Sequence, residues 1–273
     1  MWAHFLRGLL IAITTLSVSS GVVFAGAFED GLAVAQRGNY AIALQVWRPL
    51  AEQDNAEAQY ELGMMYFEGQ GVAKDFKESA KWYQLAAEQG NAAAQFGIGF
   101  MYSKGQGVAQ DFKEAVKWYL LSAEQGYRDA QHNLGVMYGT GDGIAQDYKE
   151  ALKWNRLAAE QGDAYAQSTL GAMYYGGQGV TQDFEEAVKW YRLAAAQGDA
   201  QAQFNLAWNY EQGKGVARDF VRAHMWLNLA AAQGFADAAK NRDAISKRMT
   251  AKQIAEAQAM ARKCEASNYK QCD

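Results

Sequence analysis

Residues 56–91 read AEAQYELGMMYFEGQGVAKDFKESAKWYQLAAEQGN, and the next four stretches of thirty-six residues repeat this one without insertion or deletion. The register is marked by five tryptophans spaced thirty-six residues apart: Trp82, Trp118, Trp154, Trp190 and Trp226. Self-similarity at a fixed period of about 20–50 residues is typical of a solenoid, in which each unit buries its apolar face only against its neighbours. One unit therefore predicts most of the fold.

The first half of the unit is predicted to be a helix, here called helix A. Leu62 and Met65 lie on its apolar side, and glycines at Gly69 and Gly71 end it. Gly63 lies in the middle of helix A and recurs as glycine in the next three units. Because glycine in mid-helix costs up to about 1 kcal/mol relative to alanine, we expect it to allow close approach of a neighbouring helix.

The second half of the unit is predicted to be helix B, beginning at Asp75. Asp75 followed by Glu78 predicts a capping box, in which the glutamate reaches back to the first residue. Arg222 replaces the glutamate in the fifth unit, so we expect that cap to be the weakest. The apolar arc of helix B includes Trp82 and Tyr83 and is too wide for one partner. We expect it to lie between its own helix A and helix A of the next unit.

Three sequence runs resemble the Sel-one-like repeat (SLR) family, a relative of the tetratricopeptide repeat. They are A-x-A-Q-x-x-L-G-x-M-Y in helix A, the loop G-x-G-V-x-x-D, and A-x-x-W-Y-x-x-A-A-x-x-G in helix B, in five copies over residues 56–235. Tetratricopeptide repeats run about 34 residues and usually end near a proline, whereas the one proline here, Pro49, lies elsewhere. The resemblance implies an all-α fold, a right-handed superhelix or solenoid of antiparallel helix pairs, that acts as an interaction scaffold.

Residues 1–27 are predicted to be a secretory signal peptide. Arg7 lies in a short n-region, an apolar core follows, and Ala25-Gly26-Ala27 forms a small-residue cleavage site. We expect cleavage after Ala25 or Ala27, which leaves no membrane span. The alternative is an uncleaved anchor, but a span needs about 20 apolar residues and several Thr, Ser and Gly interrupt this one. We therefore expect a periplasmic or secreted protein.

Residues 28–55 are predicted to form an N-terminal capping half-repeat. It has a short helix, a turn at residues 38–39 and a second helix from Tyr40 to Gln53, and it lacks the glycine loop. Pro49 lies inside that second helix, so we expect a kink or one missing backbone hydrogen bond.

Residues 236–273 are predicted to form capping helices and a tail at the C-terminal end. A last helix is expected to start at Thr250, with Gln253 completing a capping box. The two cysteines, Cys264 and Cys272, are most simply joined by a disulfide in an exported protein. Its stabilisation should be modest, since loop closure gives about 3 kcal/mol for roughly 15 residues and less for shorter loops. A metal pair is the alternative, but the spacing fits no zinc pattern.

The charge pattern argues against nucleic-acid binding. The formal net charge is −4, and half of the residues are apolar. Nucleic-acid binding favours a basic stripe, but the lysines that recur on helix B alternate with glutamates. We therefore expect helix B to present a solvated convex face.

No residue pattern predicts an enzyme, a metal or a cofactor. His4 leaves with the signal peptide, and His132 and His224 lie in different units without the partner that catalysis needs. Ser267 and Lys270 match the S-x-x-K motif of penicillin-binding proteins and class A β-lactamases, but no K-T-G occurs. Some cysteine-rich secreted SLR proteins are linked with penicillin binding, but those carry a cysteine pair in each repeat. An envelope enzyme of this type is the alternative to a scaffold.

Comparison of the five units indicates where binding could occur. In tetratricopeptide-type repeats helix A lines the inner, concave surface, and here the corresponding positions vary and hold several large side chains. The candidate binding residues are Tyr60, Met64, Phe96, Phe100, His132, Tyr165, Tyr175, Phe204 and Trp208. Aromatic anchors suit protein or peptide recognition. The alternative for each residue is that it packs sideways on the next unit.

We therefore expect a monomeric, non-enzymatic scaffold of the bacterial cell envelope that binds a protein or peptide on its concave helix A face. A carbohydrate-binding scaffold that uses the same aromatics is a second alternative. Four aromatics should matter for binding more than for folding, because the fourth unit has Ser168 or Ala172 at their positions: Phe96, Phe100, Phe204 and Trp208.

Overall fold

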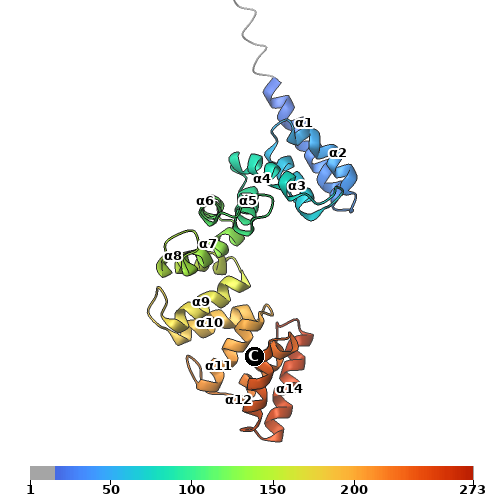
Figure 1. Cartoon of the computed structure of the whole chain (residues 1–273). Coiled ribbons are helices and arrows are strands. Elements are labelled where there is room, and N and C mark those ends of the chain that lie inside the picture. Colours follow the sequence, from blue (N-terminus) through green and yellow to red (C-terminus); the bar gives the residue numbers. More distant parts are fainter. Residues whose placement is uncertain (1–15, 273) are drawn as a thin grey trace, which may run out of the picture. The chain divides into compact units, whose positions relative to one another are not determined.

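The computed structural model describes the backbone of residues 16–272 and the side chains of residues 26–272. Within this range the chain is helical throughout, with fourteen α-helices and no strand (Figure 1). This confirms the predicted all-α fold. None of the helices in the described range is long and apolar enough to cross a membrane.

The described part of the chain forms two compact units, one ending at Gln125 and the other beginning at Gly126, which are described separately. The first unit contains the helices α1 (Leu16–Ala35), α2 (Tyr40–Ala51), α3 (Ala56–Glu68), α4 (Phe76–Glu88), α5 (Ala92–Lys104) and α6 (Phe112–Glu124). The second contains α7 (Arg128–Thr140), α8 (Tyr148–Glu160), α9 (Ala164–Gly176), α10 (Phe184–Ala195), α11 (Ala200–Gln212), α12 (Phe220–Ala232), α13 (Ala236–Ser246) and α14 (Ala251–Ala266).

Both units are stacks of antiparallel helix pairs. Helix A of the five repeats is α3, α5, α7, α9 and α11, and helix B is α4, α6, α8, α10 and α12. Within each unit, helix B packs on its own helix A and on helix A of the next repeat, as in α4 with α5, α8 with α9, and α10 with α11. This is the predicted sandwich of helix B, and it makes each unit part of an α-solenoid.

The segment before the repeats is an antiparallel pair of helices, α1 and α2. Residues 1–15 of the predicted signal peptide lie outside the described residues, and α1 continues as one helix through Ala25 and Ala27. The second helix begins at Tyr40, as the sequence predicts, and ends at Ala51. Pro49 lies inside it.

The capping boxes predicted at the start of helix B are wrong. Asp75 does cap α4, since its carboxylate accepts the amide N–H groups of Lys77 and Glu78. However, its own backbone N–H donates to the carbonyl of Tyr66 in helix A, at 3.0 Å. No donor is left for Glu78, which instead lies 3.8 Å from the ammonium of Lys81. By contrast, the predicted capping box at Thr250 and Gln253 of α14 is present.

The cap of the fifth repeat differs from the other four, and its expected weakness stays a prediction. Asp219 accepts the backbone N–H of Arg222, and it gains an ion pair with the guanidinium of the same residue at 2.7 Å. Burial alone would raise the pKa of Asp219, but the hydrogen bonds and the charge of Arg222 outweigh it and lower the pKa.

An aromatic ring of helix B packs against the glycine in the middle of helix A. A Cβ atom at Gly63 would lie 2.4 Å from the Tyr83 ring, and one at Gly171 would lie 2.7 Å from the Tyr191 ring. These distances are too short for any real contact, so the expected close approach is confirmed. The third repeat has Asn155 at the position of the tyrosine.

The second glycine of the loop lies against the preceding helix pair at Gly71, Gly107, Gly179 and Gly215. Gly107 has φ +72°, and a Cβ atom there would lie 2.0 Å from the carbonyl oxygen of Phe76, the first residue of helix B before it. Gly215 makes the same approach to Phe184. Both the positive φ and the contact require glycine. A loop of another length would lose this contact.

A buried glutamine in helix A joins neighbouring helices. Gln59 is 1% exposed, and its amide donates to the carbonyl of Ala51 at 3.0 Å and accepts from Gln89 at 2.7 Å. The carbonyl contact recurs in three other repeats through Gln95, Gln167 and Gln203. The glutamine pair recurs in all five repeats. We call this pair of bonds the glutamine clamp.

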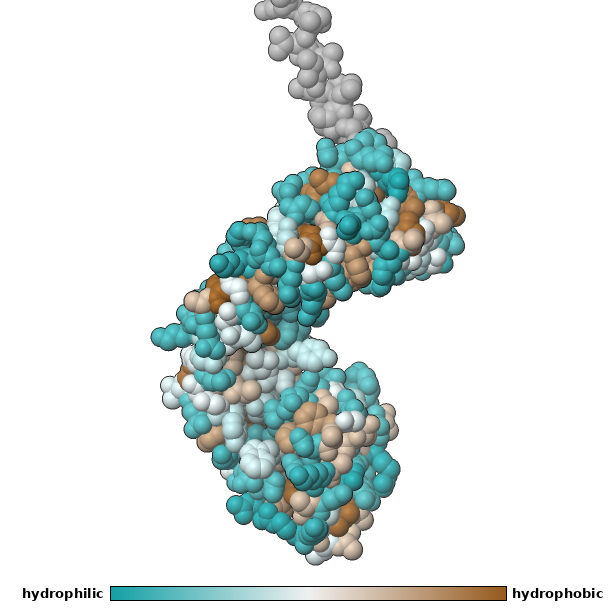
Figure 2. Space-filling model, in the orientation of Figure 1, coloured by the Kyte–Doolittle hydropathy of each residue, from teal (hydrophilic) through white to brown (hydrophobic). Residues whose placement is uncertain are grey.

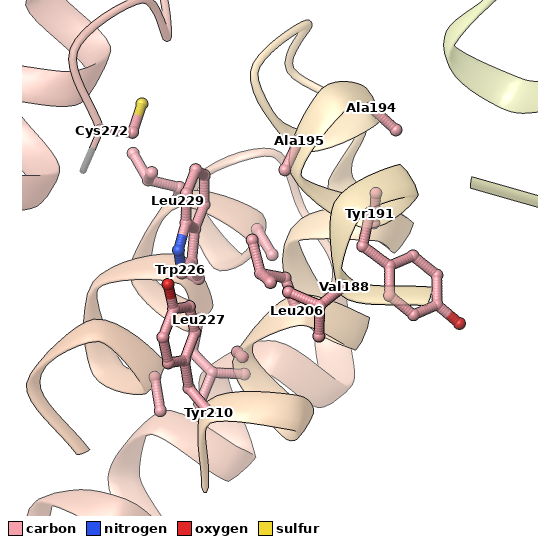
Figure 3. Packing of buried hydrophobic residues seen from close by; sticks show 14 of the residues in the cluster. Val188, Tyr191, Ala194, Ala195, Leu206, Tyr210, Trp226, Leu227, Leu229 and Cys272 are labelled. Atoms are coloured by element: carbon pink, nitrogen blue, oxygen red, sulfur yellow. The ribbon is translucent and has the colours of Figure 1, made fainter. Parts of the chain in front are cut away.

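The apolar core of the second unit continues to the tail. Figure 3 shows Trp226 next to Leu229 and Tyr210, with Cys272 close by, and these residues belong to one buried cluster. Cys264 and Cys272 form the expected disulfide. The five tryptophans are not equivalent, because Trp118 and Trp190 are half-buried while the other three are buried.

We predict opposite effects for two glycine substitutions in helix A. Gly63→Ala should destabilise the protein by about 1–3 kcal/mol, because the added methyl overlaps the Tyr83 ring. Gly139→Ala is the matched control in α7. Its Cβ would meet only Ala151 at 3.9 Å, so it should stabilise by about 0.5–1 kcal/mol. Urea denaturation of both variants measures the change in unfolding free energy. A change in the same direction for both variants would refute the interpretation.

We also predict that His224 makes the protein less stable in acid. This residue is 2% exposed, and its Nδ1 has no hydrogen-bond partner in the described chain. Burial lowers the pKa of His224, helped by Arg242 and opposed by Asp243. Its stability contribution is therefore complete above the unfolded pKa of about 6.5 and is lost as the pH falls from there towards the lowered folded pKa.

His224→Leu tests this, because the third repeat has Leu152 at that position. The variant should lose less stability than the natural protein when urea denaturation is compared at pH 7 and pH 5. An unchanged loss would show that His224 is not the group responsible.

Candidate binding surfaces on helices A

The first unit carries a row of half-buried aromatic side chains on α3 and α5. The ring centroids of Tyr60 and Tyr83 are 5.8 Å apart, and so are those of Phe96 and Tyr119. Both partners belong to helix B of the same repeat. The Tyr60 hydroxyl also donates to the sulfur of Met64 at 3.1 Å. Part of the surface of these candidate side chains is therefore buried in contacts within the protein.

The row continues across the boundary between the first two repeats. Phe100 lies 6.1 Å from Phe67 and 6.4 Å from Phe96 between ring centroids. The Lys104 ammonium lies over the Phe100 ring, 5.8 Å from its centroid. Phe67 was not among the predicted site residues. The sideways packing considered as the alternative applies here, since Phe67 and Phe100 belong to adjacent repeats.

Two candidates of the second unit are exposed. Tyr165 is 70% exposed on α9, and Trp208 is 43% exposed on α11. Large apolar side chains of this kind are available to a partner without unfolding. On the face in view in Figure 2, hydrophobic side chains of each unit lie among hydrophilic ones.

Tyr175 lies at a junction between the fourth and fifth repeats. Its hydroxyl oxygen accepts from the indole N–H of Trp208 and from the ammonium of Lys214, each at 3.0 Å. Its ring packs edge-on against Phe184 at 5.1 Å. Burial raises the pKa of Tyr175, but the Lys214 and Trp208 donors outweigh it and lower the pKa.

Phe204 and His132 are more enclosed. Phe204 packs on Phe235 with a centroid distance of 5.0 Å, so it contacts the end of its own repeat. His132 lies 4.0 Å from the Asp163 carboxylate and 6.3 Å from the Tyr165 ring. Burial lowers the pKa of His132, while Asp163 and Asp129 act in the opposite direction. His132 is therefore predominantly neutral at pH 7.

The residues considered for catalysis and metal binding have structural contacts. The Ser267 hydroxyl donates to the Cys264 carbonyl at 2.7 Å and accepts the backbone N–H of Gln271 at 2.9 Å. These bonds hold the turn inside the disulfide loop. In the described part of the chain, no three or more His, Cys, Asp or Glu side chains are grouped so as to hold a metal ion.

Sequence reasoning identified the helix A positions but missed Lys214. This residue lies between the two loop glycines, where the other repeats have Gln70, Gln106, Asp142 and Gln178. The sequence predicts only that the loop glycines end helix A. The change from a neutral or acidic residue to lysine was the signal that could have identified it.

Stacked antiparallel helix pairs with a repeat of thirty-six residues define an α-solenoid repeat protein. The Sel1 repeat matches residues 56–91, 92–127, 128–163, 164–199 and 200–235. The chain therefore belongs to the Sel1 repeat family, the Sel-one-like repeats that its sequence resembles. Proteins of this family are generally interaction scaffolds without catalytic activity.

Two solved structures are similar over most of the chain. A Sel1 repeat protein from Oxalobacter formigenes is 38% identical with a TM-score of 0.73, covering 78% of this chain and 84% of that one. The protein c5321, a protective antigen of uropathogenic Escherichia coli with an SLR fold, is 30% identical with a TM-score of 0.62. That match covers 90% of this chain and 62% of c5321. A search of curated proteins found no match.

We predict that Phe96 contributes to stability and Tyr165 does not. Phe96→Ala removes contacts with two rings and should cost about 1–3 kcal/mol, below the 3–5 kcal/mol of a fully buried phenylalanine. Tyr165→Ala removes a side chain that is 70% exposed and should change stability by less than about 0.5 kcal/mol. Urea denaturation measures both, and similar losses would contradict the assignment.

Proposed function

We propose that this protein is a monomeric, non-enzymatic scaffold of the bacterial cell envelope that binds a protein or peptide through its helix A surfaces. The proposal rests mainly on one observation. Tyr165 and Trp208, on helices A of consecutive repeats, keep 70% and 43% of their surface exposed. Tyrosine and tryptophan are the side chains that most often carry binding energy at interfaces.

The helix B side offers a competing surface. Leu121, Leu157 and Leu193 recur at one helix B position and are 46%, 38% and 50% exposed. Isolated surface leucines are common in soluble proteins and need no function. Aliphatic side chains are also poorer anchors than Tyr and Trp, so the helix A side is favoured.

Affinity capture from the envelope fraction, with the purified mature chain as bait, tests the proposal. Trp208→Ala together with Tyr165→Ala should weaken capture of the partner at least about thirtyfold, corresponding to about 2 kcal/mol or more. The matched control is Leu157→Ala with Leu193→Ala. Loss of capture in the leucine variant alone would place binding on helix B and overturn the proposal.

Location and activity are tested separately. Mass spectrometry of the mature protein should find Gly26 or Phe28 as the first residue, and an intact Met1 or a cytosolic fraction would contradict export. A labelled penicillin should leave the chain unmodified, whereas an adduct at Ser267 would establish the enzyme alternative. Binding to a glycan array without any protein partner would establish the carbohydrate alternative.

A further inference from the structure

Three residues that depart from the other repeats meet at one place in the second unit. Trp208 stands where the other repeats have Met64, Phe100, Val136 and Ala172. Tyr175 stands where they have Phe67, Ser103, Gly139 and Glu211. Lys214 replaces a glutamine or an aspartate. Although the fourth repeat supplies one of these side chains and the fifth supplies two, hydrogen bonds join all three.

The hydrogen bonds of this cluster leave only donors available. A tyrosine hydroxyl has two acceptor lone pairs and one proton. Trp208 and Lys214 occupy the acceptor side of the Tyr175 oxygen, so its O–H can only donate, and it has no acceptor among the hydrogen bonds of the described chain. Lys214 uses one of its three N–H groups in this contact.

The positive charge of the cluster is held in place but not neutralised. The Lys214 ammonium lies 5.1 Å from the Tyr175 ring centroid and 5.0 Å from that of Phe184, so two rings fix its position. Within the described residues no carboxylate forms an ion pair with it. Glu211, at the end of the same helix A, is paired with Arg248 at 3.4 Å.

The remaining surface of the cluster is apolar. Trp208 is 43% exposed even though its indole N–H is bonded to Tyr175. An apolar ring therefore lies next to two polar donors, one of them charged. This combination is complementary to a group that has negatively charged acceptors and an adjoining apolar part.

We infer that Tyr175, Lys214 and Trp208 form a recognition point for a carboxylate that adjoins an apolar side chain in a protein or peptide partner. The Tyr175 O–H and a free Lys214 N–H donate to the carboxylate, and the apolar side chain packs on Trp208. This inference rests on the proposed function and specifies the partner's chemistry. The lowered pKa of Tyr175 agrees with it, since a more acidic phenol is a better donor.

Titration of the mature chain with short peptides, followed by the NMR signal of the Trp208 indole N–H, tests the inference. Trp208→Phe identifies the signal by removing it. Ac-Gly-Phe-Glu-Gly-NH₂ should shift the signal saturably, and the same peptide with glutamine should bind at least about tenfold more weakly. Ac-Gly-Phe with a free carboxylate is a second arm. Whichever acid binds more tightly assigns the source as a side chain or a chain end.

Variants separate the two donors from the rest of the surface. Lys214→Gln introduces the residue of three other repeats, and Tyr175→Phe introduces that of the first repeat. Each should reduce binding of the acidic peptide to near that of the glutamine peptide. Lys240→Gln, an exposed lysine of α13 in the same unit, is the matched charge control and should leave binding unchanged. The folded state of each variant is checked by its urea denaturation.

Three results would overturn the inference. They are equal binding of the glutamate and glutamine peptides, equal effects of Lys240→Gln and Lys214→Gln, and inorganic phosphate binding as tightly as the acidic peptide. Failure of this kind is distinguishable from failure of the proposed function. If Trp208→Ala still abolishes capture of an envelope partner, the scaffold function stands and only the carboxylate chemistry is wrong.

Discussion

The stacking of the repeats depends on the glutamine clamp. The last carbonyl groups of any helix have no partner within that helix, and the carbonyl of Ala51, at the end of α2, is one of them. Gln59 of the following helix A donates to it, in addition to the backbone N–H of Asp54 in the turn after α2. A typical intramolecular hydrogen bond contributes about 0.5–1.5 kcal/mol, and the Gln59 side chain, which is 1% exposed, makes this bond only while the two helix pairs are stacked. The hydrogen bonds of the glutamine clamp and the burial of apolar side chains thus favour the same stacking.

The regular part of the fold could be predicted because its signals are local. Gly69 and Asp75 mark the ends of two helices, and both have the expected roles as C-cap and N-cap. The predicted capping box is absent because the backbone N–H of Asp75 donates to the carbonyl of Tyr66. This contact is with helix A and is not part of the local motif. Gln59 was overlooked as a structural residue because glutamine is usually exposed.

The candidate site was only partly predictable for the same reason. Helix periodicity identifies which positions share a face, but the exposure of each ring depends on what stands opposite it. Tyr60 and Phe96 face a tyrosine of helix B and are half-buried. Tyr165 lies at another helix A position and remains exposed. Lys214 could be assigned to the candidate site only from the structure, because the loop after α11 brings it to Tyr175 of the preceding repeat.

The glutamine clamp and the loop glycines have a consequence for how such chains can change in length. Each clamp and each loop contact joins only neighbouring elements, as Gln167 does with Ala159 and Gly179 with Tyr148. A chain that gained or lost one whole repeat of thirty-six residues would keep a donor for every one of these carbonyls. A change of a few residues would break them. Whole repeats are therefore the units by which such a chain can change in length, and its helix A surface can be lengthened or shortened without any change to the contacts in its interior.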